Sequence, residues 1–337
     1  DELSQSFYSL VDGQSAGVVK DAPAIIADVI AHLEKQKLLE DKDIVGIDTG
    51  FRQLNEMTKG FKHGDLIIIA ARPGMGKTTI CLNLMNHVLM RGGGVVFFSL
   101  EMPAEQIMLR MLSAKTSIPL QNIMTAKMDD EEWSRLSDAC EDMSSRKLFV
   151  YDSGYVNIHQ IRTQMRKLKS SHPEITLCVI DYIGLMMATS NFSDRHLQIA
   201  EISRGLKLLA RELDMPIIAL SQLNRSLESR ANKRPMLSDL RESGAIEQDA
   251  DMILFVYRDE VYREQEEKEA EKKAHAEGKE YVRKFVPNKI EEDAEIIVGK
   301  NRNGPVGTVE VIFQKEFTRF VDKSFGAAHV AEFNPNA

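Results

Sequence analysis

The stretch from residue 65 to residue 79 combines the residue types that bind phosphate. It reads Asp-Leu-Ile-Ile-Ile-Ala-Ala-Arg-Pro-Gly-Met-Gly-Lys-Thr-Thr, so an apolar run passes through Gly and Pro into a Lys-Thr pair that opens a helical pattern. Strand, loop and helix in this order are typical of a phosphate-binding P-loop. Gly74 and Gly76 let several backbone N–H groups point into one concavity, and the start of the following helix adds partial positive charge there.

The last side chains of this stretch have the chemistry that a nucleoside triphosphate needs. Lys77 can reach the β- and γ-phosphates, and the Thr78 hydroxyl can bind Mg²⁺. Ala71 stands where the usual pattern has Gly, and a small residue fits that turn. The alternative is a Gly/Pro loop that only links a strand to a helix. The expected cofactor-binding loop consists of Gly74, Met75, Gly76, Lys77, Thr78 and Thr79.

Two carboxylates follow apolar runs further along the chain. Asp181 ends the run Cys-Val-Ile-Asp, which is the Walker B layout for holding Mg²⁺. Glu101 comes just after the apolar run at 95–99, where strand ends of a parallel sheet face a ligand. It can orient or deprotonate a water aimed at the γ-phosphate, or it can simply stabilise the start of a helix near Pro103.

Two further segments fit a nucleotide site less directly. Gln222 ends the run Ile-Ile-Ala-Leu-Ser-Gln. Its amide can form hydrogen bonds to both a γ-phosphate and a neighbouring loop, which would let it report the nucleotide state. The alternative is an ordinary polar residue at a strand end. Lys300-Asn-Arg302-Asn-Gly-Pro is a basic hairpin turn. Its charges are either plain soluble surface or an arginine finger that reaches the γ-phosphate on an adjacent subunit.

Composition limits the class of protein. The chain has 337 residues, 43% hydrophobic and 28% charged, as in a globular protein of one large or two small domains. Three scattered cysteines argue against a zinc site or disulfides, so we expect a reducing, cytoplasmic setting. No apolar run has membrane-spanning length, residues 1–20 lack a signal-peptide layout, and the start at Asp1 suggests a fragment. The net charge of −8 opposes broad nucleic-acid binding but permits a local basic channel.

Apolar runs alternate with helical patterns along most of the chain. This predicts an α/β fold, a mainly parallel sheet flanked by helices on both faces. The expected strands are 66–71, 95–99, 148–151, 176–181 and 216–221, and the expected helices are 78–91, 103–117, 130–144, 157–170 and 197–213. After about residue 250 strands follow without long helices, which indicates antiparallel additions at one edge. These are 252–257, 294–299, 307–313 and 317–321.

The chain divides into a linker, a catalytic domain and a tail. Residues 1–40 read as a linker with an amphipathic helix at about 21–40, which packs either on its own domain or on a neighbouring subunit. Residues 41–325 form the catalytic domain and 326–337 the tail. A charged block at about 260–290 has opposite charges four residues apart, which predicts a solvated helical insertion, with a docking surface as the alternative.

Together these motifs resemble the C-terminal motor domain of the bacterial replicative DNA helicase, the DnaB family. The likeness covers residues 21–325 in the family's order, although Gly74 replaces a frequent Ser and the charged block is longer. The matching segments include Ala-Arg-Pro-Gly-Met-Gly-Lys-Thr-Thr, Ser-Leu-Glu-Met, Ile-Asp-Tyr, Ala-Leu-Ser-Gln-Leu-Asn-Arg, Leu-Arg-Glu-Ser-Gly and Gly-Lys-Asn-Arg-Asn-Gly-Pro-Val-Gly. The resemblance implies a RecA-like P-loop NTPase fold, in a homohexameric ring around single-stranded DNA with ATP and Mg²⁺ at subunit interfaces.

The resemblance also assigns roles to single residues. It implies catalytic roles for residues already named, which are Lys77, Thr78, Glu101, Asp181 and Gln222. It implies nucleotide contacts from Arg110 and, across the interface, from Lys300, Asn301 and Arg302. It implies DNA contacts from Arg241, Glu242 and Gly244, and from Arg195 in a second central loop at about 188–197.

The partners and the direction of movement follow from the resemblance alone. It implies a primase, a helicase loader and 5′→3′ movement, with no membrane. Two other functions stay open on the residues themselves: a RecA/RadA-type recombinase filament, which shares the fold and the P-loop, and a non-catalytic nucleotide-binding switch.

Overall fold

The structure is a computed structural model that describes residues 21–37, 44–189, 194–240 and 243–323. It divides into two compact units, Asp1–Val45 and Gly46–Ala337. Among the described residues of the first unit, one helix forms, α2 (Ala22–Lys37), within the range predicted for the linker helix. Asp21 Oδ1 accepts a hydrogen bond from the Ala24 N–H at 3.1 Å and so caps the helix start. The apolar side chains of α2 are about half exposed, namely Ile25, Ile26, Val29, Ile30 and Leu33.

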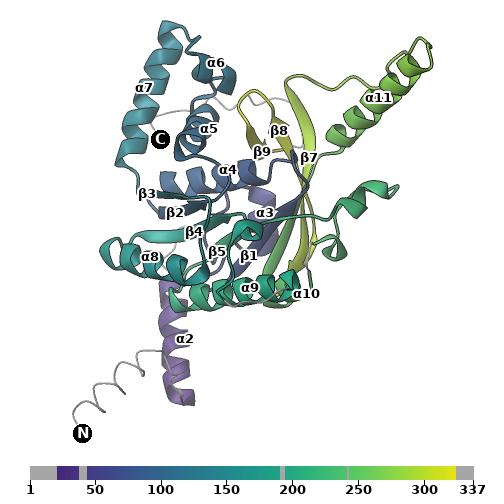
Figure 1. Ribbon diagram of the computed structural model, residues 1–337. Coiled ribbons are helices and arrows are strands. Elements are labelled where there is room, and N and C mark those ends of the chain that lie inside the picture. Colours follow the sequence, from purple (N-terminus) through teal and green to yellow (C-terminus); the bar gives the residue numbers. More distant parts are fainter. Residues whose placement is uncertain (1–20, 38–43, 190–193, 241–242, 324–337) are drawn as a thin grey trace. The chain divides into compact units, whose positions relative to one another are not determined.

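A nine-stranded sheet forms the centre of the second unit (Figure 1). In spatial order its strands are β3 (Leu148–Asp152), β2 (Gly94–Ser99), β4 (Ile175–Asp181), β5 (Ile217–Gln222), β1 (Leu66–Ala71), β6 (Met252–Tyr257), β7 (Glu291–Asn301), β8 (Gly307–Gln314) and β9 (Arg319–Asp322). The first six strands are parallel, and β7, β8 and β9 are antiparallel additions at one edge. This confirms the α/β fold expected from the sequence.

One strand runs opposite to expectation. The sequence predicts 252–257 among the antiparallel additions, but β6 pairs in parallel with β1, with Ile67 opposite Met252. The chain returns across the sheet before β6 begins, through a path that ends in the short helix α10 (Ser243–Asp249). A crossover of this kind is what brings a following strand into a parallel arrangement.

Helices cover both faces of the sheet (Figure 1). The layer formed by α4, α5 and α7 lies on one face, and the layer formed by α8, α9 and α10 on the other. The five longer helices of these layers each bury an apolar stripe, because apolar residues three and four positions apart share one helix face, whereas the short α10 buries Ile246. The helices of this unit are α3 (Arg52–Thr58), α4 (Lys77–Met90), α5 (Ala104–Thr116), α6 (Leu120–Thr125), α7 (Asp130–Ser145), α8 (Ile158–Ser171), α9 (Arg195–Glu212), α10 and α11 (Asp259–Ala276), with short 3-10 turns at Ile183–Leu185, Arg225–Ser229 and Leu237–Asp239.

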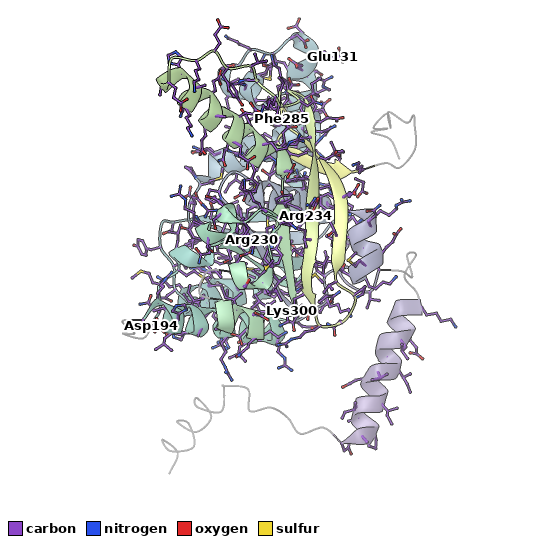
Figure 2. The ribbon with its side chains drawn as sticks, turned by 90° about the vertical axis from the view of Figure 1, so that its right-hand side faces the viewer. Glu131, Asp194, Arg230, Arg234, Phe285 and Lys300 are labelled. Carbon is purple, nitrogen blue, oxygen red and sulfur yellow. The ribbon has the colours of Figure 1, made fainter. Side chains whose placement is uncertain are left out.

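The charged block contains the helix that its spacing predicts. In α11, Lys268 forms an ion pair with Glu264 at 2.6 Å. The chain then folds back along this helix, since the Tyr281 hydroxyl donates to Glu267 Oε2 at 2.8 Å and Arg283 pairs with Glu271 at 2.7 Å. In Figure 2 this segment, marked by Phe285, and Lys300 lie at opposite ends of the antiparallel strands.

Within the described ranges we find no helix with both the length and the apolar character needed to cross a lipid bilayer.

Candidate nucleotide-binding site

The P-loop joins the end of β1 to the start of α4. Gly74 and Gly76 have φ values of +80° and +93°, a region that side chains with a Cβ rarely adopt. Gly76 also lies against Phe320, whose ring carbon would be 2.8 Å from an added Cβ. Ala71, by contrast, is the last residue of β1, and its carbonyl accepts the Leu223 N–H at 3.1 Å. Its backbone is ordinary strand, so the methyl group in place of Gly costs nothing in conformation.

The predicted P-loop side chains meet the predicted Walker B aspartate. The Thr78 hydroxyl donates to Asp181 Oδ2 at 2.6 Å, and Lys77 Nζ lies 3.2 Å from Asp181 Oδ1. The Lys77 ammonium also lies 4.4 Å from the centroid of the Tyr182 ring. Strands β1, β5 and β4 are neighbours in the parallel sheet, and this is why their C-terminal ends bring these groups together.

The oxygen atoms of this cluster suit a small divalent cation. Asp181 is 1% exposed, and its Oδ1 atom accepts no hydrogen bond from the described residues, with Lys77 beside it only as an ion-pair partner. A carboxylate oxygen and a hydroxyl oxygen are ligands that Mg²⁺ prefers. Thr78 and Asp181 therefore fit the role of Mg²⁺ ligands.

Glu101 lies beside this cluster on an ordered turn. The Leu100 N–H donates to the Asp181 carbonyl at 2.8 Å, which ties the end of β2 to the end of β4. Glu101 itself is exposed. At the start of α5, the residue that caps the helix is Asp152, whose Oδ2 accepts the Ala104 N–H at 2.9 Å. Glu101 thus directly follows the residue that ties the end of β2 to the end of β4, and its side chain is exposed to solvent.

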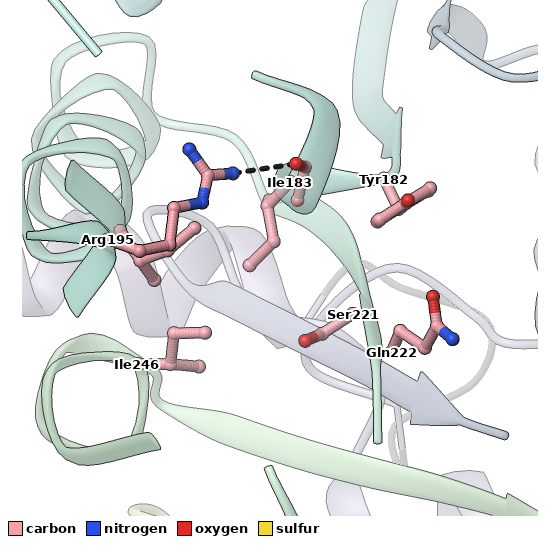
Figure 3. A pocket seen from close by; sticks show the side chains of 8 residues that line it. Tyr182, Ile183, Arg195, Ser221, Gln222 and Ile246 are labelled. Carbon is pink, nitrogen blue, oxygen red and sulfur yellow. Dashed lines mark hydrogen bonds between the residues drawn. The ribbon is translucent and has the colours of Figure 1, made fainter. Parts of the chain in front are cut away.

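A cavity of about 230 Å³ adjoins the end of β5 (Figure 3). Its lining includes Tyr182 from the end of β4, Gln222 from the end of β5, Arg195 from the start of α9 and Ile246 from α10. The guanidinium of Arg195 donates to the Gly184 carbonyl at 2.6 Å, so it contacts the segment that follows β4. The cavity therefore places Gln222 next to the elements that follow both predicted DNA loops.

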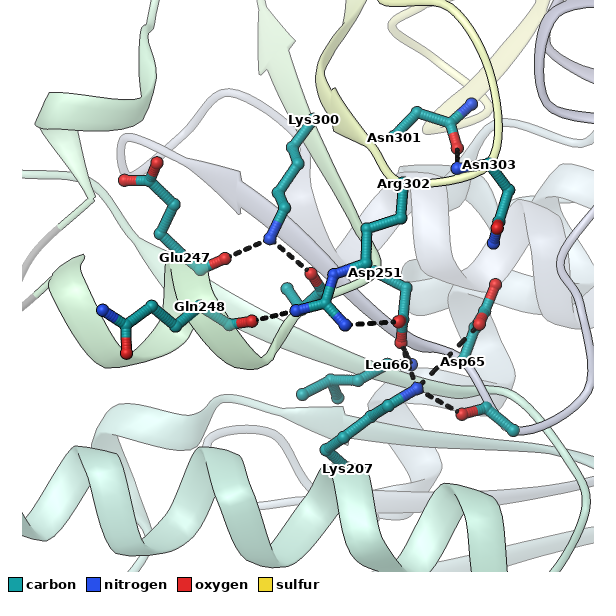
Figure 4. A network of polar contacts seen from close by, with 12 residues as sticks. Asp65, Leu66, Lys207, Glu247, Gln248, Asp251, Lys300, Asn301, Arg302 and Asn303 are labelled. Atoms are coloured by element: carbon teal, nitrogen blue, oxygen red, sulfur yellow. Dashed lines mark hydrogen bonds and ion pairs between the residues drawn. The ribbon is translucent and has the colours of Figure 1, made fainter.

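The basic hairpin lies at the end of the sheet where β1 begins, opposite the P-loop, and Figure 4 shows the polar contacts around its Lys300 and Arg302 side chains. Asn301 pairs with Met252, the first residue of β6, whereas the P-loop follows the last residue of β1. Arg302 pairs with Asp251 at 3.3 Å and donates to the Gln248 carbonyl, and Lys300 donates to the Ala250 carbonyl at 2.7 Å. Both side chains thus bond to the last turn of α10, or just beyond it.

Charge is dense around this hairpin. Burial lowers the pKa of Lys300, and the neighbouring Arg302 lowers it further. Asp251 is buried and also accepts the Leu66 N–H at 2.8 Å and the Lys207 ammonium at 2.5 Å. Burial, with the nearby Asp251 charge, raises the pKa of Asp65 to about 6. The hairpin is therefore anchored to the start of β1 and to α9 as well as to α10.

The other residues predicted to bind DNA or nucleotide form no hydrogen bond or ion pair with the P-loop cluster among the described residues. Arg241 and Glu242 lie outside the described residues. Gly244 lies in the first turn of α10, and within the described ranges nothing beyond its own helix turn approaches within 4 Å of where a Cβ would be. Arg110 is half-buried in α5.

Two arginines at the P-loop were missed by the sequence reasoning. Arg72 donates to Glu228 Oε1 at 2.8 Å, and Arg258 donates to the Gly74 carbonyl at 2.8 Å. Arg72 and Glu228 are 156 residues apart in the sequence, and Gly74 and Arg258 are 184 apart, so no local sequence pattern predicts either contact.

Comparison with known proteins identifies the family. Residues 46–322 match the family model described as the DnaB-like helicase C terminal domain. The replicative DNA helicase DnaB of Helicobacter pylori is 44% identical over 332 residues, which are 95% of this chain and 68% of that protein. That of Geobacillus stearothermophilus is 40% identical over 326 residues, 96% of this chain and 66% of that protein. The chain thus spans about two thirds of these relatives' length.

Solved structures agree with this result. One of them, an ATPase domain, gives a TM-score of 0.77 at 36% identity, over 90% of this chain and 100% of that one. A DnaB-like replicative helicase, solved in a study of its interactions with primase, gives 0.77 at 34% identity, over 96% of this chain and 72% of that one. The motif-based prediction is confirmed: the chain belongs to the DnaB-like helicase family, as the ATP-hydrolysing motor domain of a replicative DNA helicase.

Proposed function

We propose that this chain forms a homohexameric ring, holds ATP and Mg²⁺ between neighbouring subunits, and moves 5′→3′ on single-stranded DNA to unwind the duplex at the replication fork. The observation that carries the shared site is the separation of Lys77 from Arg302. Strand β1 has six residues, which at about 3.3 Å each amount to roughly 20 Å between the two ends of the sheet. An arginine side chain does not span that length, so the hairpin can complete a P-loop site only on another subunit.

Each residue of the shared site then has one task. Lys77 would hold the β- and γ-phosphates, and Thr78 and Asp181 would hold Mg²⁺, which offsets phosphate charge when it is bound. Glu101 would orient the attacking water, and Gln222 would bond the γ-phosphate. Further nucleotide contacts would come from Met75, Thr79 and Arg110 of one subunit, and from Lys300, Asn301 and Arg302 of its neighbour.

Coupling to DNA would run through the cavity beside β5. Gln222, Arg195 of α9 and Ile246 of α10 all line it, so a shift of Gln222 on loss of the γ-phosphate would act on the helices that follow both predicted DNA loops. Arg241, Glu242 and Gly244 would contact the phosphates of the strand, with Arg195 in the second loop. The exposed apolar stripe of α2 would dock on the adjacent subunit. We propose primase and a helicase loader as the protein partners.

Multiple-turnover phosphate release with single-stranded DNA tests this function. We expect DNA to stimulate hydrolysis, and electron microscopy of the same sample to show closed six-fold rings. Open filaments on DNA would favour a recombinase, and a single turnover without recycling would favour a nucleotide-binding switch. A monomer that hydrolyses ATP at the full stimulated rate would contradict the shared site.

Replacing Arg241 by alanine should weaken binding to single-stranded DNA. Loss of one phosphate contact per subunit should lower affinity by about tenfold and reduce the dependence of affinity on salt concentration, while hydrolysis without DNA continues. Fluorescence anisotropy of a labelled oligonucleotide over a salt series measures both. Arg135→Ala, which removes an exposed arginine of α7, is the matched control. Equal salt slopes for both variants would remove Arg241 from the DNA site.

A further inference from the structure

A buried ion pair lies against the P-loop and has no part in the roles proposed above. Arg258, directly after β6, and Glu292, in β7, are 9% and 5% exposed. Arg258 Nε donates to Glu292 Oε1, and the ring of Phe313 in β8 lies 4.0 Å from the guanidinium carbon. Two charges this enclosed are costly unless further hydrogen bonds satisfy them. The remaining N–H groups of Arg258 therefore need acceptors of their own.

One of those donors bonds to the P-loop itself. Arg258 Nη1 donates to the Gly74 carbonyl at 2.8 Å. The N–H of the same peptide group, that of Met75, donates to the Arg72 carbonyl at 3.3 Å. The C=O and N–H of a trans peptide lie in one plane and point in opposite directions. The peptide between Gly74 and Met75 is therefore held from both sides.

Gly74 is the position where holding a peptide matters most. Its φ is +80°, and apart from its chain neighbours no atom of the described residues lies within 4 Å of the place where a Cβ would be, so no side-chain packing at Gly74 fixes the backbone and hydrogen bonds have to do so. A charged guanidinium holds a carbonyl more strongly than a neutral donor does. Without that bond only the 3.3 Å bond from the Met75 N–H holds the peptide, so other orientations become accessible, and ordering the peptide again would oppose ligand binding.

The same edge of the sheet supports the second P-loop glycine. Phe313, under the Arg258 guanidinium, packs on Phe320 with ring centroids 4.8 Å apart, and Phe320 lies against Gly76. Lys315 links the buried ion pair to α11. Its ammonium lies 3.5 Å from Glu292 Oε2 and also pairs with Glu260 in the first turn of α11. The antiparallel strands and the base of the charged segment therefore converge on the P-loop.

We propose that Arg258, held in place by Glu292, is a positioning residue that preorganises the P-loop for the phosphates of the nucleotide. It acts through the Gly74 carbonyl and does not touch the ligand. This inference rests on the proposed nucleotide binding by the P-loop. Because the loop contacts phosphates before and during reaction alike, loss of Arg258 should raise KM for ATP and Kd for ADP more than it lowers kcat.

Two variants separate this role from a contribution to folding. Arg258→Lys keeps the charge opposite Glu292, but one ammonium cannot also reach Gly74 as the forked guanidinium does. The double variant Arg258→Met with Glu292→Met removes both buried charges, which leaves neither one unpaired. The control is Arg319→Lys, the same change at another arginine of the sheet extension, whose side chain bonds Gln314 and the Ala114 carbonyl instead of the P-loop.

The measurements are calorimetric titration with Mg-ADP, steady-state KM and kcat for ATP, and thermal unfolding of each variant in the complete chain. We expect both Arg258 variants to stay folded and to bind ADP about 10- to 100-fold more weakly, and Arg319→Lys to bind it as the unsubstituted chain does. Unchanged ADP affinity in both Arg258 variants, or an equal loss in Arg319→Lys, would overturn the proposal. An unsubstituted chain that binds no ADP would instead contradict the proposed nucleotide site.

Discussion

Replacing Lys77 by alanine is expected to lower DNA-stimulated ATP turnover by about 10³-fold or more. Lys77 is the P-loop side chain whose positive charge can follow the phosphates, and its ammonium already lies 3.2 Å from the buried Asp181 carboxylate. In the proposed mechanism it leaves that carboxylate for the γ-phosphate, where charge develops during transfer. Steady-state phosphate release with saturating single-stranded DNA measures the loss.

The expected loss must be separated from an effect on folding. Alanine at this position leaves the Thr78 hydroxyl bonded to Asp181, so the carboxylate keeps a partner and the P-loop should persist. We therefore expect Lys77→Ala to unfold at nearly the same temperature as the unsubstituted chain and to sediment identically. A folded Lys77→Ala variant whose turnover falls less than about tenfold would exclude Lys77 from transition-state stabilisation.

Local patterns were enough to place the strands of the sheet. Apolar runs of four to six residues between helical patterns located β1 to β5 within a residue or two, because strands buried on both faces, as β1, β2, β4 and β5 are, must be apolar nearly throughout. The predicted direction of β6 was wrong for a related reason. Direction depends on the connection that precedes a strand, and the seven-residue α10 is too short for its periodicity to reveal a crossover.

The candidate site likewise contains some contacts that the sequence predicted and others that it did not. The meeting of Lys77, Thr78 and Asp181 was predictable, because strand ends of a parallel sheet face one crevice and each motif follows a strand. The contact of Arg258 with Gly74 was not predicted, because Arg258 follows β6 and the sequence pattern placed that strand among the antiparallel additions instead of parallel to β1. The location of Arg302 required the register of β6 with β7, which the residues of the hairpin do not encode.

Replacing Arg302 by alanine is the second large effect expected. In the assembled ring, loss of a finger that stabilises charge on the γ-phosphate should lower stimulated hydrolysis by about 10³-fold or more. Arg302 also bonds Asp251 and the Gln248 carbonyl within its own chain, so a loss of activity alone does not separate action on a neighbour from distortion of α10. Full stimulated hydrolysis by Arg302→Ala would contradict the trans assignment directly.

Mixing two inactive variants separates these explanations. Suppose that rings are assembled from Lys77→Ala and Arg302→Ala subunits together. Where an Arg302→Ala subunit supplies the P-loop and a Lys77→Ala neighbour supplies the hairpin, the shared site has both an intact Lys77 and an intact Arg302. Hydrolysis in the mixture should therefore exceed that of either variant alone. If Arg302 served its own P-loop, every site in the mixture would lack one of the two residues and no activity would return. If its loss acted only by distorting the chain that carries it, the P-loop of that chain would stay inactive beside any neighbour, and again nothing would be recovered.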